Sequence, residues 1–140
     1  MSNDKKEAVL WESVGEGQVQ CNLCNFRCKL ADGKRGICQV RANEGGTLYS
    51  LNYHKVCSTA IDPIEKKPLF HFQPGSRSLS VACPGCNFRC DFCQNWQISQ
   101  LPRLHEKLVG RSHTPEEIVQ AAKQNRCANI SYTYTEPTIF

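Results

Sequence analysis

The sequence predicts an α/β fold in which a small cysteine-rich module precedes a βαβ unit of a parallel sheet. Ten of the 140 residues are cysteines, and most of them gather in two groups. Beyond the first group, residues 78–82 and 130–135 alternate as strands do, and a helical pattern lies between them. We expect a lead-in over 1–17, the cysteine-rich module and a connector over 18–77, and the start of the parallel sheet over 78–140.

The composition is that of an ordinary globular domain, with 40% hydrophobic and 21% charged residues. The N-terminus lacks the apolar region of a secretory signal, and no apolar run is long enough to cross a membrane. Clustered cysteines in a reducing cytosol are more often metal or cluster ligands than disulfides, so we expect a cytoplasmic metalloprotein. The net charge of +4 is spread along the chain, which argues against nucleic-acid binding.

Turn residues dominate the cysteine-rich module. Gly45 and Gly46, followed by the alternating residues 47–51, predict a hairpin. Three prolines punctuate residues 52–77, so we expect a connector without long regular elements.

The helical pattern begins near Thr114. Thr114 and Glu117 have the spacing of a capping box, and Pro115 suits the first position of a helix. Parallel strands joined by such a helix end at the same edge of their sheet. The second cysteine group and Glu136 follow these two strand ends, so we expect Glu136 to reach a ligand held by the cysteines.

Cys86, Cys90 and Cys93 follow the first strand with the spacing C-x3-C-x2-C. Thiolates are the usual ligands of iron–sulfur clusters, and four irons normally take four of them. Three ligands in one tight loop leave one iron open, as a catalytic zinc site keeps an open position. We therefore predict a [4Fe–4S] cluster that binds S-adenosylmethionine (SAM) through its amino and carboxylate groups and cleaves it reductively.

The triad and its surroundings resemble the radical SAM superfamily, in particular the proteins related to pyruvate formate-lyase activating enzymes. These residues resemble one branch closely, namely the AmmeMemoRadiSam system radical SAM enzyme family. The resemblance spans roughly residues 18–140 and rests on three segments, which are Cys21–Arg41, Ile61–Phe72 and Gly85–Trp96.

The resemblance implies a (β/α) barrel, often incomplete, of which this chain is an N-terminal fragment. It implies an oxidoreductase that forms a 5′-deoxyadenosyl radical for hydrogen abstraction, with activation of a glycyl-radical-type partner as one use. It further implies an electron donor of the flavodoxin or ferredoxin type, and it leaves a protein substrate open.

Two further residues acquire roles on SAM through the resemblance. Phe92 is expected near the adenine and Glu136 on the amino group. The two glycines that precede this glutamate in many relatives are Tyr134 and Thr135 here, so only the Glu136 role carries over. The alternatives are a core aromatic for Phe92, and for Glu136 an acidic residue before a helix that starts at Pro137.

Cys83 leaves a rival interpretation open. With the triad it makes C-x2-C-x3-C-x2-C, which would close the cluster and produce a ferredoxin-like electron-transfer module. We favour Cys83 as a thiol that binds no metal. A zinc-stabilised interaction module without catalysis is the third hypothesis.

Four further cysteines, Cys21, Cys24, Cys28 and Cys38, have the spacing C-x2-C-x3-C-x9-C. Four thiolates in a module too small for its own core predict a second, structural metal site. Zinc and an auxiliary iron–sulfur cluster use the same thiolates, so both remain open. The isolated Cys57 and Cys127 are expected to be buried small hydrophobes.

Overall fold

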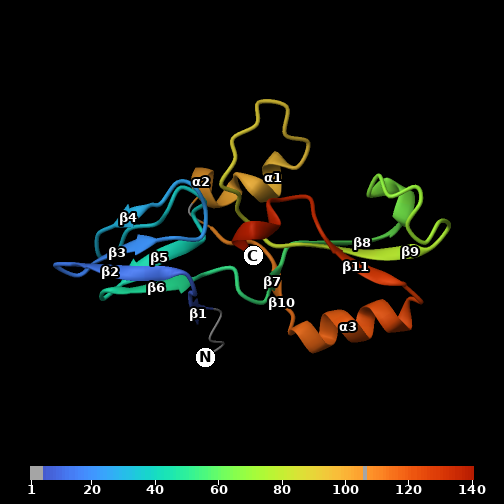
Figure 1. Cartoon of the computed structure of the whole chain (residues 1–140), viewed down its shortest axis with the longest axis horizontal. Coiled ribbons are helices and arrows are strands. Elements are labelled where there is room, and N and C mark those ends of the chain that lie inside the picture. The colour runs from blue at the N-terminus through green and yellow to red at the C-terminus, as the bar shows by residue number, and fades with distance from the viewer. Residues whose placement is uncertain (1–4, 106) are drawn as a thin grey trace.

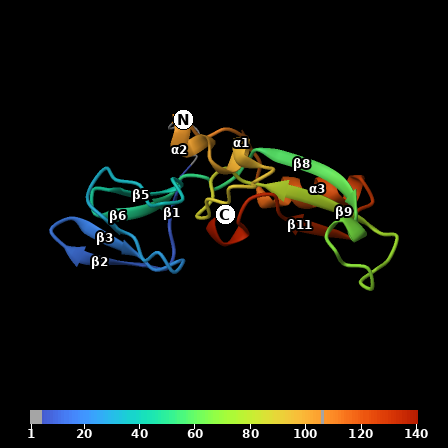
Figure 2. The ribbon, with the colours of Figure 1, turned by 90° about the horizontal axis from the view of Figure 1, so that it is seen from above.

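The computed structural model describes residues 5–105 and 107–140. The loop that carries Cys86, Cys90 and Cys93, residues 83–95, is called the cysteine loop below and lies between two lobes. Figure 1 shows a strand-rich lobe of N-terminal residues at one end and a sheet backed by α3 at the other. Figure 2, the view from above, keeps this order, with the loop, α1 and α2 near the middle. The prediction of a mixed α/β fold is confirmed, whereas closure into a barrel stays a prediction.

The N-terminal lobe contains two three-stranded antiparallel sheets, with the orders β1–β6–β5 and β2–β3–β4. Its core is a cluster of apolar side chains that both sheets contribute, including Ala8, Val19, Leu30 and Leu48. The strands are β1 (Lys6–Glu7), β2 (Trp11–Gly15), β3 (Gln18–Cys21), β4 (Lys29–Leu30), β5 (Arg41–Glu44) and β6 (Thr47–Ser50).

The predicted hairpin joins β5 to β6. Gly45 and Gly46 have φ of +62° and +85°, the left-handed values that a two-residue turn between twisted strands requires. The predicted lead-in contains strands β1 and β2. Residues 1–4 lie outside the described part, but β2 pairs with β3, and Trp11 packs against the lobe's core.

The second lobe is a three-stranded mixed sheet with the order β11–β9–β8. Strand β9 (Arg77–Ala82) runs parallel to β11 (Asn129–Tyr132), and helix α3 (Pro115–Gln124) lies between them in sequence. The capping box forms as predicted, because Thr114 Oγ1 accepts from the Glu117 N–H while the Glu117 carboxylate accepts from the Thr114 N–H. The βαβ unit is therefore confirmed.

The expected connector contains a strand. Residues Ser58–Pro63 form β8, which pairs antiparallel with the whole of β9, so the second lobe begins before residue 78. Pro63 ends β8, and proline is tolerated there because β8 is an edge strand of the sheet. Short elements surround it, namely β7 (Lys55–Val56) paired with β10 (Arg111–Ser112), and the 3-10 turn η1 (Ile64–Lys66).

The two faces of β9 differ in chemistry. Leu79 and Val81 pack beneath α3 in an apolar cluster that also contains Ala122. Ser78 and Ser80, which alternate with them, are fully buried on the opposite face. The remaining helical elements are α1 (Trp96–Ser99), α2 (Leu101–His105) and the 3-10 turn η2 (Pro137–Ile139).

Candidate functional site

The cysteine loop leaves β9 at Ala82 and returns at α1, projecting from the junction between the lobes (Figure 1). The Gly85 N–H donates to the Ile98 carbonyl at 3.0 Å, which closes the base of the loop. Further along, Gln100 Nε2 donates to the Phe88 carbonyl at 3.0 Å. These two hydrogen bonds hold the first half of the loop against α1 and the residue that follows it.

The three predicted cluster ligands differ in exposure. Cys86 is buried, Cys93 is half-buried and Cys90 is exposed. The Phe88 N–H donates to Cys86 Sγ at 3.4 Å, and Cys93 Sγ lies 3.4 Å from the Ser99 hydroxyl. Hydrogen bonds to sulfur stabilise thiolates and tune iron–sulfur clusters, so the chemistry of this loop fits such a group.

The positions of the sulfurs do not by themselves define a metal centre. Among the residues that the structure describes, no group of three or more Cys, His, Asp or Glu side chains is placed to hold a metal ion. The assignment of Cys86, Cys90 and Cys93 to a cluster therefore stays a prediction.

Cys83 sits in a different environment from the triad. Burial raises the pKa of its thiol to about 12, and the neighbouring Cys57 adds to this shift. Cys57, opposite Cys83 where β8 and β9 diverge, has a pKa raised by burial to about 11 and donates its S–H to the Ala82 carbonyl. A thiolate at either cysteine therefore forms less readily than at an ordinary, exposed thiol.

The end of β11 lies beside the start of the cysteine loop, as the parallel topology predicts. The Thr135 hydroxyl donates to the Cys83 carbonyl at 2.8 Å. Asn52, fully buried, donates through Nδ2 to the Pro84 carbonyl at 3.4 Å and to the Ile139 carbonyl at 3.1 Å. These two side chains join the loop to the segment that carries Glu136.

Glu136 caps the short turn η2. Its carboxylate accepts from the Thr138 N–H at 3.1 Å and from the Thr138 hydroxyl. This is the capping role that we kept as the alternative, and contact with SAM stays a prediction. Phe92 is 86% exposed, so the alternative of a core aromatic is wrong. Its predicted place near the adenine remains untested.

The four N-terminal cysteines lie at a strand end and in the turns of the first lobe. Cys21 ends β3, Cys24 and Cys28 lie in the following turn, and Cys38 precedes β5. Burial raises the pKa of Cys21, although the Leu23 N–H and then the Arg41 charge lower it.

Cys38, like Cys21, is buried and feels the Arg41 charge. Burial raises the pKa of Cys38, against the lowering effects of the Val40 and Arg41 N–H groups and of the Arg41 charge. The sulfur of Cys28 lies beside Gly36: a Cβ added to Gly36 would be 3.6 Å from Cys28 Sγ. The two cysteine turns are therefore neighbours.

A buried polar cluster, which sequence reasoning missed, lies on the serine face of the second lobe. Asp62 of β8 accepts from Lys66 at 2.9 Å, Lys67 at 2.8 Å, Ser80 at 2.6 Å and Tyr134 at 2.7 Å. Burial raises the pKa of Asp62, but these donors together hold it well below its usual range. Asp62 and both lysines belong to the Ile61–Phe72 segment. The resemblance of this segment to the radical SAM branch was the one sequence feature that could have drawn attention to the polar cluster.

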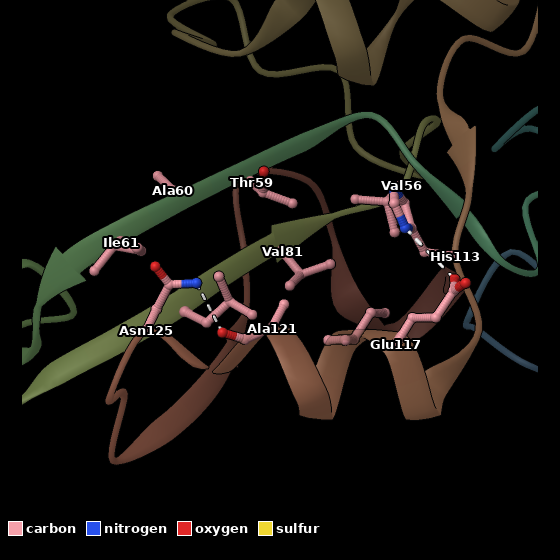
Figure 3. Close-up of a pocket in the computed structure, with 11 residues that line it drawn as sticks. Val56, Thr59, Ala60, Ile61, Val81, His113, Glu117, Ala121 and Asn125 are labelled. Carbon is pink, nitrogen blue, oxygen red and sulfur yellow. Dashed lines mark hydrogen bonds and ion pairs between the residues drawn. The ribbon is translucent and has the colours of Figure 1, made fainter. Parts of the chain in front are cut away.

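The opposite face of this sheet carries a pocket of about 350 Å³ between β8 and α3. Figure 3 shows Val81 and Ala121 in it, and His113 Nδ1 lies 3.6 Å from the Glu117 carboxylate at one end. None of the triad cysteines lines this pocket. Helix α3 covers β9 and β11 more fully than β8, so we interpret the pocket as a gap left by incomplete packing.

Two findings bear on the kind of protein. Among the described residues, no helix is both long and apolar enough to cross a membrane. Residues 80–140, which contain the cysteine loop, α3 and β11, match the family model of the Radical SAM superfamily. The finer assignment to the AmmeMemoRadiSam branch stays a prediction.

Two curated relatives come from Methanocaldococcus jannaschii. The chain is 51% identical over 135 residues to uncharacterized protein MJ0808, covering 96% of the chain and 40% of that protein. It is 26% identical over 125 residues to uncharacterized protein MJ0674, covering 84% of the chain and 31% of that protein. The chain thus spans less than half the length of both relatives. No solved structure matches it.

Proposed function

We propose that this chain is the cluster-binding part of a radical SAM enzyme, with Cys86, Cys90 and Cys93 as the ligands of a [4Fe–4S] cluster. When bound, the cluster supplies the electron that breaks a sulfonium C–S bond of SAM, giving methionine and the 5′-deoxyadenosyl radical. The observation on which this proposal rests is the three-cysteine loop at the end of β9. A hydrogen bond from Thr135 to the Cys83 carbonyl connects this loop to the end of β11. The match of residues 80–140 to the superfamily supports the same conclusion.

The residues around the loop have separate tasks in this proposal. The Phe88 N–H and the Ser99 hydroxyl stabilise thiolate at Cys86 and Cys93. Glu136, which follows β11, accepts from the amino group of SAM, and the exposed ring of Phe92 packs on the adenine. The 5′-deoxyadenosyl radical then abstracts hydrogen from a substrate, for which a glycyl-radical-type partner is our candidate.

The electron-transfer alternative needs Cys83 as a fourth ligand. Cys83 lies at the end of β9, before the three cysteines of the loop, and burial raises the pKa of its thiol, so it differs in environment from the exposed Cys90. The carbonyl of Cys83 also accepts from Thr135, which orients the backbone at this position for strand-end packing. We therefore prefer three ligands and an open iron.

The experiment is anaerobic reconstitution of the 140-residue chain with iron and sulfide, followed by reduction with and without SAM. We expect an electron paramagnetic resonance signal that changes when SAM is added, and 5′-deoxyadenosine in the product mixture. Serine at Cys86, Cys90 or Cys93 should abolish both, whereas Cys83→Ser and Cys127→Ser should keep both. Loss with Cys83→Ser but not with Cys86→Ser would overturn the assignment.

Glu136 and the substrate are tested separately. Glu136→Gln keeps the cap on η2 but removes the negative charge, so the SAM concentration needed for the spectral change should rise about tenfold. An unchanged SAM requirement would remove Glu136 from the site. Deuterium transferred from a labelled partner into 5′-deoxyadenosine would identify the substrate, and its absence would exclude that partner.

A further inference from the structure

The chain turns just beyond β11, at Tyr134. The φ of this residue, +69°, lies in the left-handed region, which glycine adopts freely and a bulky residue rarely does. A residue with a side chain keeps such a conformation only where its surroundings hold it there. The contacts of Tyr134 therefore bear on the path of the segment that follows it, which carries Glu136.

The phenol of Tyr134 is bound to the far edge of the sheet. Its hydroxyl donates to Asp62 Oδ2 at 2.7 Å. Asp62 belongs to β8, whereas Tyr134 follows β11, and the central strand β9 lies between these two strands (Figure 2). The bond thus connects the two outer strands of this sheet across the strand that separates them.

The strand register shows how the Tyr134 side chain lies. Asp62 pairs with Ser78, near the start of β9. Tyr132, the last residue of β11, pairs with Val81 near the end of β9, and Tyr134 follows two positions later. To reach Asp62, the Tyr134 side chain must therefore extend back along the serine face of the sheet.

Asp62 is a strong acceptor for this bond, because it is 5% exposed and bound by charged donors. Lys67 Nζ donates to the same oxygen, Oδ2, at 2.8 Å and lies 5.0 Å from the centroid of the Tyr134 ring. Hydrogen bonds to a charged group are stronger than those between neutral groups, and a cation near the face of an aromatic ring adds attraction. Both the hydroxyl and the ring of Tyr134 are held in this way.

We propose that Tyr134, anchored on Asp62, is a positioning residue that holds the end of β11 in the conformation that presents Glu136 to SAM. This rests on the proposed function, in which Glu136 accepts from the amino group of SAM. The next residue, Thr135, donates to the Cys83 carbonyl at 2.8 Å, so adjacent side chains fix the segment to β8 and to the cysteine loop. Because two bonds share this task, loss of the Tyr134 bond weakens SAM binding without abolishing it.

The test compares Tyr134→Phe with Ser80→Ala in the full 140-residue chain. Tyr134→Phe removes the hydroxyl that anchors the segment beyond β11. Ser80→Ala is the matched control, because Ser80 donates to the same Asp62 oxygen at 2.6 Å but belongs to β9.

The first measurement is hydrogen exchange of the metal-free chain, followed by mass spectrometry. Exchange over residues 133–140 should be about tenfold faster in Tyr134→Phe than in the native chain, because a hydrogen bond to a charged acceptor is lost. Ser80→Ala should leave exchange over these residues close to that of the native chain. Native-like exchange in Tyr134→Phe would overturn the anchoring by Asp62.

The second measurement is the SAM dependence of 5′-deoxyadenosine formation by the reconstituted chain. In Tyr134→Phe the SAM concentration for half-maximal rate should rise about fivefold, while the rate at saturating SAM stays unchanged. A merely structural loss would lower the amount of active chain, and so the rate at saturating SAM, without changing the SAM concentration required. Ser80→Ala should keep the native SAM requirement.

The two measurements separate this proposal from the proposed function. An unchanged SAM requirement in Tyr134→Phe, or an equal rise in Ser80→Ala, would overturn the positioning role. If the unsubstituted chain formed no 5′-deoxyadenosine, the proposed function would fail. Hydrogen exchange needs no SAM, so it would still confirm or overturn the anchor between Tyr134 and Asp62.

Discussion

The Thr135 hydroxyl donates a 2.8 Å hydrogen bond to the carbonyl oxygen of Cys83. The bond joins the segment after β11 to the segment after β9, and the two residues are 52 positions apart in sequence. It places the cysteine loop and the Glu136 segment at one edge of the sheet, where ligands of parallel α/β sheets bind.

Removing this bond should loosen the site. Thr135→Val keeps the shape but leaves the Cys83 carbonyl without its donor, so we expect a loss of about 1 kcal/mol in the free energy of unfolding. Thr135→Ser keeps the hydroxyl and serves as the control. Urea unfolding measures the difference, and equal midpoints for the two variants would contradict a stabilising role.

Gly85→Ala should separate the triad loop from the N-terminal lobe. The new Cβ would collide with Val40 and with the Cys38 carbonyl, and the φ of +94° is strained for any residue with a side chain. We expect a loss of about 3 kcal/mol and poorer iron loading of the triad.

Gly75→Ala is the matched control for Gly85→Ala. Gly75 has φ of +75°, but nothing lies within 4 Å of the added Cβ, so only the backbone strain of about 1 kcal/mol remains. If the two variants lose equal stability and bind equal iron, close packing at Gly85 does not position the loop.

Asp62→Asn should destabilise the second lobe in a pH-dependent manner. The variant leaves Lys67, whose side chain is only 11% exposed, without its counter-charge, which costs about 3 kcal/mol near pH 7. Because the folded pKa of Asp62 is lowered, its contribution is present above the unfolded pKa and is lost as the pH falls through the folded pKa.

The difference between the native chain and Asp62→Asn should therefore shrink progressively below about pH 4. Urea midpoints from pH 7 down to pH 3 measure it, with Glu7→Gln as an exposed control that should show no such trend. A difference that stays constant over this range would mean that the Asp62 charge does not stabilise the fold.

Cys83 should react slowly with alkylating agents. Burial, with Cys57 nearby, raises its pKa to about 12, so the reactive thiolate is scarce at pH 8. Mass spectrometry of the metal-free chain after iodoacetamide treatment should find Cys90, which is exposed, modified far sooner. Reaction of Cys83 should accelerate about tenfold for each pH unit up to its pKa. Fast labelling of Cys83 near neutral pH would contradict the raised pKa of this thiol.

Local patterns in the sequence were sufficient for several elements. The capping box at Thr114 and Glu117, the paired glycines 45 and 46, and the alternation at 78–82 each act within a few residues, so each is readable without a structure. The spacing of Cys86, Cys90 and Cys93 is equally local. The βαβ order then required the parallel pairing of β9 with β11, which the structure has.

Only the tertiary structure decided the contacts between distant residues. Residues 58–63 became a strand because β9 offered a free edge, and no local pattern distinguished them from a connector. Asp62 meets Tyr134 across 72 positions, and among the described residues Nε and Nη1 of Arg41 have no hydrogen-bond partner although the fold buries them. Residue type and spacing determined which chemistry this protein has available, whereas burial and long-range pairing, which depend on the whole fold, decided where each charge and thiol lies.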